Sequence, residues 1–204
     1  MKLGLLLFPA LRGSAQLARM AEGLGFDSLV FADTQNITPE VWGQLMLAAR
    51  DTQRIELGTG VTNPGTRDAA VTASAALALQ VESGGRAVCG IGRGDSSLGT
   101  IGFSGMKPEA MDPAVRQAAL HLREHYDLRD HGRAETAHAQ NLDDAFVDGF
   151  GIVGPVETAL PRFERLKALG LDFCRVIPGS RDAAPDITGP SLLTLANVMR
   201  PAVA

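Results

Sequence analysis

Aromatic residues and cysteines are scarce in this chain of 204 residues, which has one Trp, one Tyr, eight Phe and two Cys. So few aromatic side chains argue against an aromatic-lined recognition surface. Two cysteines are too few for a disulfide scaffold and fit a reducing compartment, which predicts a cytoplasmic protein. Apolar residues make up 45% and charged residues 21% of the chain. These shares exclude a disordered tail, a collagen and a coiled coil.

Neither sign of charge dominates, and no apolar run reaches the length of a membrane span. The formal net charge of −4 provides no basic surface for nucleic acid or for an anionic membrane. We therefore expect neither of them as a partner. The apolar run at residues 3–8 is short and is ended by Pro9, which favours a buried strand over a signal peptide.

Short apolar runs alternate with longer amphipathic stretches along most of the chain. Thr38-Pro39-Glu40 combines a cap, a proline and an acid, as at the start of a helix. Such alternation predicts an α/β fold in which parallel strands are covered by helices. The predicted strands are residues 3–8, 26–31, 54–61, 86–92, 150–153 and 171–177, and the predicted helices are residues 14–24, 38–50, 69–81, 156–169 and 189–199.

The alternation breaks after the fourth predicted strand. Residues 93–108 are rich in glycine, and residues 109–148 are polar, with a helical composition and no strand-like run. Six strands fall short of the eight in a closed (β/α)8 barrel, which typically takes about 250 residues. The sequence therefore predicts an incomplete TIM-type barrel of about six parallel strands with extra helices. We expect a single domain over residues 1–204, with four βα units in 1–105, a helical segment in 106–149 and two βα units in 150–204.

Two segments at predicted strand ends carry a resemblance to a known family. Residues 58–68 read GTGVTNPGTRD, and residues 90–96 read GIGRGDS. With Phe31-Ala32-Asp33, they resemble the luciferase-like monooxygenase superfamily, in its methylenetetrahydromethanopterin reductase-like branch, which uses a deazaflavin. The match is good over the first four βα units and continues through Val153-Gly154-Pro155 and residues 179–182. It implies a (β/α)8 barrel with a flavin or deazaflavin over the carboxyl ends of the strands.

The resemblance also implies a non-proline cis peptide bond between Gly60 and Val61, in a bulge that backs the ring. Thr62 and Asn63 would offer a hydroxyl and an amide to the polar edge of the ring. From the residues alone, an ordinary strand end with an Asn-Pro turn is the alternative. The residues expected to bind the cofactor are Thr59, Gly60, Val61, Thr62, Asn63, Gly92, Gly94, Gly154 and Arg181.

Three charged residues at predicted strand ends are the candidate catalytic residues, namely Asp33, Arg93 and Asp95. Asp33 would accept a hydrogen bond from substrate or act as a base near the ring, or else serve as an Asx-turn or helix cap. Arg93 and Asp95 would hold polar groups of the cofactor or substrate, or else form an ion pair that ties down their loop. Asp95 also stands where a dinucleotide-binding G-x-G-x-x-G motif needs glycine, so that motif is absent.

The middle of a family barrel, with about its fifth and sixth strands, is missing between Gly105 and Met111. The resemblance places much of the phosphate site in that part. Gly154-Pro155 and Arg181 are the remaining phosphate candidates, although Gly154-Pro155 also suits a plain helix start. The expected cofactor is therefore coenzyme F-420, which is a 5-deazaflavin, or FMN. The alternative is that the chain holds none.

Three further expectations follow. Loss of two strands leaves open sheet edges, which predicts a homodimer. The segment from His121 to His125 matches the H-x-x-E-H zinc pattern, but two histidines at this spacing arise often by chance, so no metal is expected. Cys89 and Cys174 lie in apolar runs and should be buried, inert thiols.

These observations lead to two hypotheses about function. The first is a flavin- or deazaflavin-dependent oxidoreductase that transfers a hydride to, or oxygenates, a small organic substrate. The sequence shows no strong acid, base or nucleophile beyond the three charged candidates, and chemistry centred on a ring tolerates that. The second is a degenerate family member without redox turnover, which binds a small molecule or acts in a non-redox pathway step.

Overall fold

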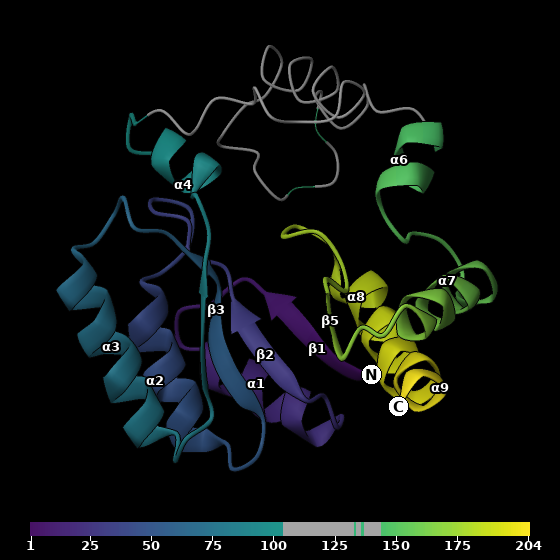
Figure 1. Ribbon diagram of the computed structural model, residues 1–204, viewed down its shortest axis with the longest axis horizontal. Helices are drawn as coiled ribbons and strands as arrows, with labels where there is room; N and C mark the ends of the chain where they lie inside the picture. Colours follow the sequence, from purple (N-terminus) through teal and green to yellow (C-terminus); the bar gives the residue numbers. More distant parts are fainter. Residues whose placement is uncertain (104–132, 134–135, 137–143) are drawn as a thin grey trace.

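A computed structural model describes residues 1–103, 133, 136 and 144–204 (Figure 1). Within these residues, five parallel strands form one sheet in the order β4-β3-β2-β1-β5. The strands are β1 (Lys2–Leu7), β2 (Ser28–Phe31), β3 (Glu56–Thr62), β4 (Ala87–Ile91) and β5 (Phe173–Val176). The α/β prediction is confirmed, and the sheet has the strand order of an incomplete TIM-type barrel.

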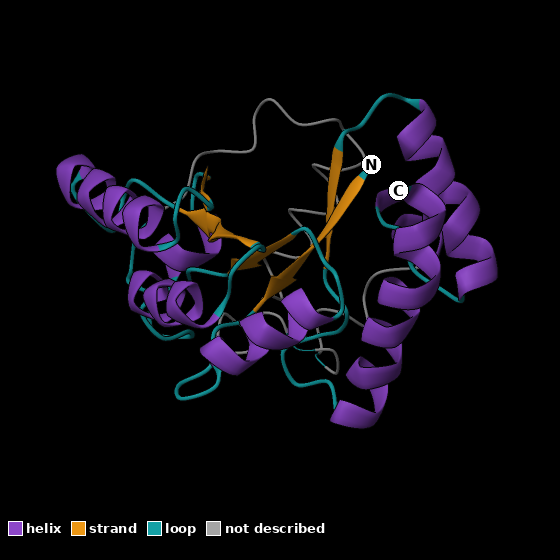
Figure 2. Ribbon diagram, turned by 90° about the horizontal axis from the view of Figure 1, so that it is seen from below, coloured by secondary structure: helices purple, strands orange, loops and turns teal. Residues whose placement is uncertain are grey.

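Helices follow the first four strands and flank the last one. Seen from below, they lie along the outer side of the curved sheet (Figure 2). Among the described residues, no helix combines the length and apolarity needed to cross a bilayer. The helices are α1 (Ser14–Gly23), α2 (Val41–Asp51), α3 (Ala69–Glu82), α4 (Asp95–Gly99), α6 (Asp144–Phe150), α7 (Val156–Ala168), α8 (Pro185–Thr194), the π-helical turn η3 (Leu195–Met199) and α9 (Arg200–Val203).

The predicted strand at residues 150–153 is wrong, so the described part of the chain has five strands and not six. Phe150 ends α6, and residues 151–153 belong to no strand. Ile152 packs against the core, while Val153 is 65% exposed. A run of four residues can bury one side chain without pairing to a neighbouring strand. The helical prediction for 109–148 is confirmed only where α6 overlaps it, because the rest lies outside the described residues.

The predicted start of the second helix is also displaced. Glu40, and not Thr38, is the N-cap of α2, because its carboxylate accepts a hydrogen bond of 2.7 Å from the Gly43 backbone N–H. Thr38 instead closes the preceding turn. Its hydroxyl accepts from the N–H of Thr34 and donates to the carbonyl of the same residue, both at 3.1 Å.

The core lies between the sheet and the helices. Alternate residues of the first three strands point to this side and are fully buried, namely Leu3, Leu5, Leu29, Phe31 and Leu57. They belong to one cluster with Ala18 and Ala21 of α1 and with Val41, Leu45 and Ala48 of α2. Each buried Leu, Val or Phe contributes about 1.5–3 kcal/mol to stability. This packing fixes α1 and α2 on the sheet.

Two charged side chains fasten the amino-terminal end of the sheet. Arg86 donates to the carbonyls of Ala49, Thr52, Ile55 and Ser83, at 2.6–3.2 Å, and burial lowers its pKa. The Glu22 carboxylate accepts from three successive backbone N–H groups, those of residues 53–55. Burial alone would raise the pKa of Glu22, but these three bonds outweigh burial and lower it. The starts of β3 and β4 are thereby set relative to α1, α2 and α3.

Candidate functional site

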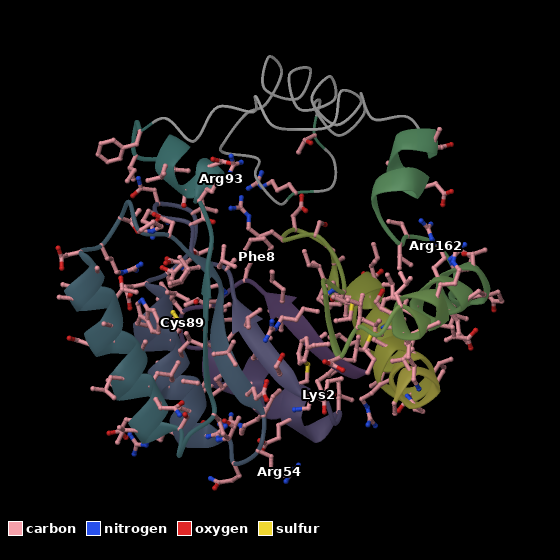
Figure 3. All side chains as sticks on the ribbon, in the orientation of Figure 1. Lys2, Phe8, Arg54, Cys89, Arg93 and Arg162 are labelled. Carbon is pink, nitrogen blue, oxygen red and sulfur yellow. The ribbon has the colours of Figure 1, made fainter. Side chains whose placement is uncertain are left out.

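The predicted site residues from the first half of the chain gather at the carboxyl ends of β2, β3 and β4. Because these strands are parallel neighbours, the loops that follow them lie at one edge of the sheet, beneath α4 (Figure 1). Phe8 after β1 and Arg93 after β4 are labelled at this same end (Figure 3). Functional residues of parallel α/β folds lie at this edge.

The end of β3 is irregular, as the family resemblance implied. The Gly60–Val61 peptide bond is cis, which confirms that prediction and excludes the ordinary strand end. The register with β4 also shifts here, because Thr59 pairs with Cys89 but Thr62 pairs with Ile91. β3 therefore carries one extra residue at its tip, a β-bulge.

Close packing explains the glycines of this tip. A Cβ on Gly60 would lie 2.4 Å from Cγ2 of Val30, and one on Gly90 would lie 2.4 Å from the carbonyl oxygen of Thr59. The Thr59 hydroxyl in turn donates to the Gly90 carbonyl at 2.8 Å. The two Cβ contacts of 2.4 Å are shorter than a real Cβ tolerates, so strand packing alone accounts for glycine at positions 60 and 90.

Thr62 and Asn63, both 1% exposed, use their polar groups within the protein. The Thr62 hydroxyl donates to Asp33 Oδ2 at 2.7 Å. The Asn63 amide donates to Ser97 Oγ at 2.8 Å and accepts from the Gly65 N–H at 3.1 Å. These two side chains hold the β3–α3 loop against the end of β2 and against α4. Their predicted role in binding a ring stays a prediction.

An ion-pair network that the sequence did not reveal is centred on Arg67. Its guanidinium donates to Asp33 Oδ2 at 2.7 Å and to Glu40 Oε1 at 3.0 Å. Burial alone would lower the pKa of Arg67, but the two carboxylates outweigh burial and raise it. Asp33 also accepts from Gln35 Nε2 at 2.8 Å. The two carboxylate partners of Arg67 lie 34 and 27 residues away along the chain, so no local sequence pattern could have identified this arginine.

Arg93 and Asp95, which follow β4, form the ion pair that was the simpler of their two predicted roles. Both side chains are nearly half exposed, at 43% and 48%. Asp95 opens α4, and Gly94 before it has a φ of 77°. The Gly92 N–H donates to the Thr62 carbonyl at 2.8 Å, which extends the pairing between β3 and β4 by one residue. The pair is thus held beside the β3 tip while remaining open to a ligand.

A cavity of about 240 Å³ lies on the helix side of this tip. Its wall is mostly apolar and combines the β3–α3 loop, one side of α3 and the outward face of β4. Cys89 is exposed, so the prediction that it is buried is wrong: β4 is an edge strand of the described sheet. The lining residues are Thr62, Asn63, Pro64, Arg67, Ala69, Thr72, Ala73, Ala76, Cys89 and Ile91.

The remaining two predicted cofactor residues lie elsewhere. Gly154 precedes α7, which packs against α9, and Arg181 lies in the loop after β5 and has interaction partners. β5 and β4 are opposite edges of the described sheet. The structure therefore does not bring Gly154 and Arg181 into the cluster around β3 and β4.

No metal centre is found in the part of the chain that the structure describes: it contains no group of three His, Cys, Asp or Glu side chains that could hold an ion. The H-x-x-E-H pattern at residues 121–125 lies outside that part.

Comparison with known proteins points to one family. The sequence profile of the luciferase-like monooxygenases matches residues 4–112, which is more than half of the chain. The 5,10-methylenetetrahydromethanopterin reductase of Methanolobus tindarius is 43% identical over 95 residues, 46% of this chain and 29% of that protein. The reductase of the same name from Archaeoglobus fulgidus is 43% identical over 91 residues, 44% of this chain and 27% of that protein.

One solved structure is also similar in sequence. The coenzyme F-420-dependent tetrahydromethanopterin reductase of Methanopyrus kandleri is 33% identical, with a TM-score of 0.49. That comparison covers 61% of this chain and 40% of the other. The chain thus spans less than half the length of the relatives that it matches.

Proposed function

Because this chain belongs to the luciferase-like monooxygenase family, we propose that it is a flavin- or deazaflavin-dependent oxidoreductase acting on a small organic substrate. One observation carries the proposal: the segment shared with the family, residues 4–112, contains most of β1, all of β2 to β4 and the loops at their carboxyl ends. Those loops hold Asp33, Arg93 and Asp95, together with the bulged tip of β3. The two curated relatives, which match 95 and 91 residues of this chain, are named as reductases.

The tip of β3 offers a surface that fits one face of a flat ring. Val61 is 47% exposed, although it belongs to β3, a strand with a neighbouring strand on each side. It lies beside Gly90 and Gly92, where a Cβ would come within 3.2 and 2.4 Å of its methyl groups. Residues alternate along β4, so this surface is opposite to the one bearing Cys89 and Ile91. The Val61 methyl groups fill the space beside the two glycines, and a planar ligand would lie on the exposed side of Val61.

The ring would supply the hydride or oxygen chemistry, and the chain would bind and orient it. Val61 would support the face of the ring. Because Thr62 and Asn63 are engaged within the protein, hydrogen bonds to the polar edge would come from backbone groups near Gly92 and Gly94. The exposed Arg93 and Asp95 would hold polar groups of cofactor or substrate. Gly154 and Arg181 stay proposed phosphate ligands, since helix amides and a guanidinium suit an anion.

A member of the family without redox turnover is the second candidate. It is favoured by one observation: the best-buried polar groups of the site, those of Asp33, Thr62 and Asn63, are all satisfied by the protein itself. Such a chain would bind a small apolar molecule at the strand ends and catalyse no electron transfer.

We further propose that the chain pairs with a second copy through α3 and the edge strand β4. Val71, Leu77 and Val81 of α3 are 57–68% exposed, and Ile91 of β4 is 62% exposed. α3 carries no charged residue between Asp68 and Glu82, so two copies of this face meet without burying a charge. Light scattering should show a dimer that Leu77→Glu disrupts; a monomer at ordinary concentrations would refute this proposal.

Absorbance titration with FMN and with coenzyme F-420 tests the redox proposal. We expect a visible band that shifts on binding to the pure protein, and loss of binding in Val61→Glu, which puts a charge under the ring. Leu169→Glu is the matched control, because Leu169 is 79% exposed at the end of α7. A spectrum unchanged with both rings would favour the non-redox candidate.

A further inference from the structure

We propose that Asp33 and Arg67 are a positioning pair that fixes the tip of β3 from behind, and that Asp33 transfers no proton. The inference deepens the proposed function and rests on it only for the identity of the ligand, a flavin or deazaflavin ring. The pairing itself is independent of any ligand.

The carboxylate of Asp33 is enclosed and fully used. Its side chain is 2% exposed. Oδ2 accepts from the Thr62 hydroxyl and from the Arg67 guanidinium, both at 2.7 Å, and Oδ1 accepts from Gln35 at 2.8 Å. A general base must come within hydrogen-bond reach of the proton that it removes. Each oxygen of Asp33 already has a donor of this protein in that place.

Arg67 joins three segments that the chain keeps apart. It lies in the loop after β3, and its side chain is 16% exposed. One nitrogen binds Asp33 at the end of β2, and the other binds Glu40, whose second carboxylate oxygen caps α2 through Gly43. A planar guanidinium bridges the two carboxylates through two separate nitrogens in a fixed geometry, whereas the three donors of a lysine ammonium all extend from one nitrogen.

The network lies behind the surface proposed for the ring. Thr62 and Arg67 line the cavity on the helix side of the β3 tip, whereas Val61 lies on the other side, beside Gly90 and Gly92. Thr62 immediately follows Val61, so the hydrogen bond from Thr62 to Asp33 sets where Val61 stands. Loss of Arg67 would leave a buried carboxylate without its cation and would loosen this anchor.

The test uses Arg67→Met, Asp33→Asn and the double variant, with Arg162→Met as the matched control. Arg162 pairs with Asp148 at 2.6 Å and is 24% exposed, but it lies in α7, away from the strand ends. The measurements are ring affinity by absorbance titration and amide hydrogen exchange of residues 59–65 in the ligand-free protein.

We expect Arg67→Met to weaken ring binding roughly tenfold and to speed exchange of residues 59–65, which Arg162→Met leaves unchanged. The double variant should recover part of both losses, because it removes the unpaired buried charge. Arg67→Lys should fall between wild type and Arg67→Met, and it serves if Arg67→Met does not fold.

Two results would overturn the inference. One is an Asp33→Asn variant that binds the ring and exchanges at residues 59–65 like wild type, because the carboxylate would then hold nothing in place. The other is unchanged exchange of residues 59–65 in Arg67→Met. If the wild-type protein binds no ring, the redox proposal fails, while the exchange experiment still decides whether the pair holds the strand tip.

Discussion

α2 and α3 are consecutive helices on the same sheet, yet they are buried to very different extents. α2 buries Val41, Trp42, Leu45, Ala48 and Ala49 against the sheet and against α1. α3 is the more apolar helix, and it buries only Leu79. Their strands differ in the same way, since all four residues of β2 are buried and none of β4 is.

The difference shows that apolar composition does not by itself report burial. α3 has the sequence of a helix with neighbours on several sides, but the described residues supply them on one side only. The curated relatives are longer than this chain, and the family profile matches it only as far as residue 112, which lies after β4. The exposed side of α3 and β4 therefore marks the edge at which the described sheet ends.

The largest expected effect separates the two helices directly. Leu45→Ala in α2 removes a fully buried side chain and should lower the free energy of unfolding by about 2–5 kcal/mol. Leu77→Ala in α3 should change it by less than about 0.5 kcal/mol in dilute protein, where the proposed dimer is dissociated, since Leu77 is 65% exposed in the single chain. Urea denaturation of both variants at low protein concentration measures the difference. Equal losses there would mean that α3 is covered within a single chain.

A second substitution tests whether the hydrogen bonds of Arg86 at the end of α3 stabilise this helix, which buries few side chains. Arg86→Met should destabilise the protein by about 3 kcal/mol, because several buried carbonyls lose a charged donor at once. Arg54→Met, in the neighbouring loop, is the control. If urea denaturation gives the same midpoint for both variants, then Arg86 does not anchor the carboxyl-terminal end of α3 and the start of β4.

The fastening of α2 should depend on pH through Glu22. Its folded-state pKa lies below the ordinary value of 4.5, so its contribution to stability is present above that pH and is lost as the pH falls through the folded pKa. The difference in unfolding free energy between wild type and Glu22→Gln should therefore be largest above pH 4.5 and should shrink in acid. A difference that grows in acid would contradict this sign.

The smallest effect on stability is expected at the edge strand. Cys89→Ser should change the free energy of unfolding by less than about 0.5 kcal/mol, because Cys89 is exposed. In dilute protein, where the proposed dimer is dissociated, the Cys89 thiol should also react faster with iodoacetamide than that of Cys174, which is half-buried and whose pKa burial raises. Mass spectrometry after a timed reaction, in the Cys89→Ser and Cys174→Ser variants, compares the two thiols.

The sequence predicted the first four βα units because each one is encoded locally. An apolar run precedes an amphipathic stretch, and Gly25, with its φ of 82°, follows the first helix as expected. The strand prediction for residues 150–153 was wrong because a short apolar run has the same sequence pattern whether it pairs in a sheet or only packs against a core. The exposure of Cys89 was missed because it depends on what lies beyond β4.

The candidate site also has a part that the sequence predicted and a part that only the folded chain shows. The β3 tip was predictable, since a family resemblance links residues 58–68 to a known backbone irregularity. The role of Arg67 was not, because its partners are brought to it only by the parallel order of β2 and β3. The sequence named Asp33 for its place after a strand, and only the folded chain shows that three donors of the protein enclose it.

For protein engineering, the close packing at Gly60 and Gly90 limits which residues can be substituted. Any Cβ at these two positions would lie 2.4 Å from a neighbouring atom, so neither position can hold a residue larger than glycine. A library meant to alter which molecule the chain accepts should therefore leave both glycines untouched. Its diversity belongs at Val61, Arg93 and Asp95, whose side chains are all nearly half exposed, and not at Gly94, where a Cβ would lie 2.5 Å from Asn63.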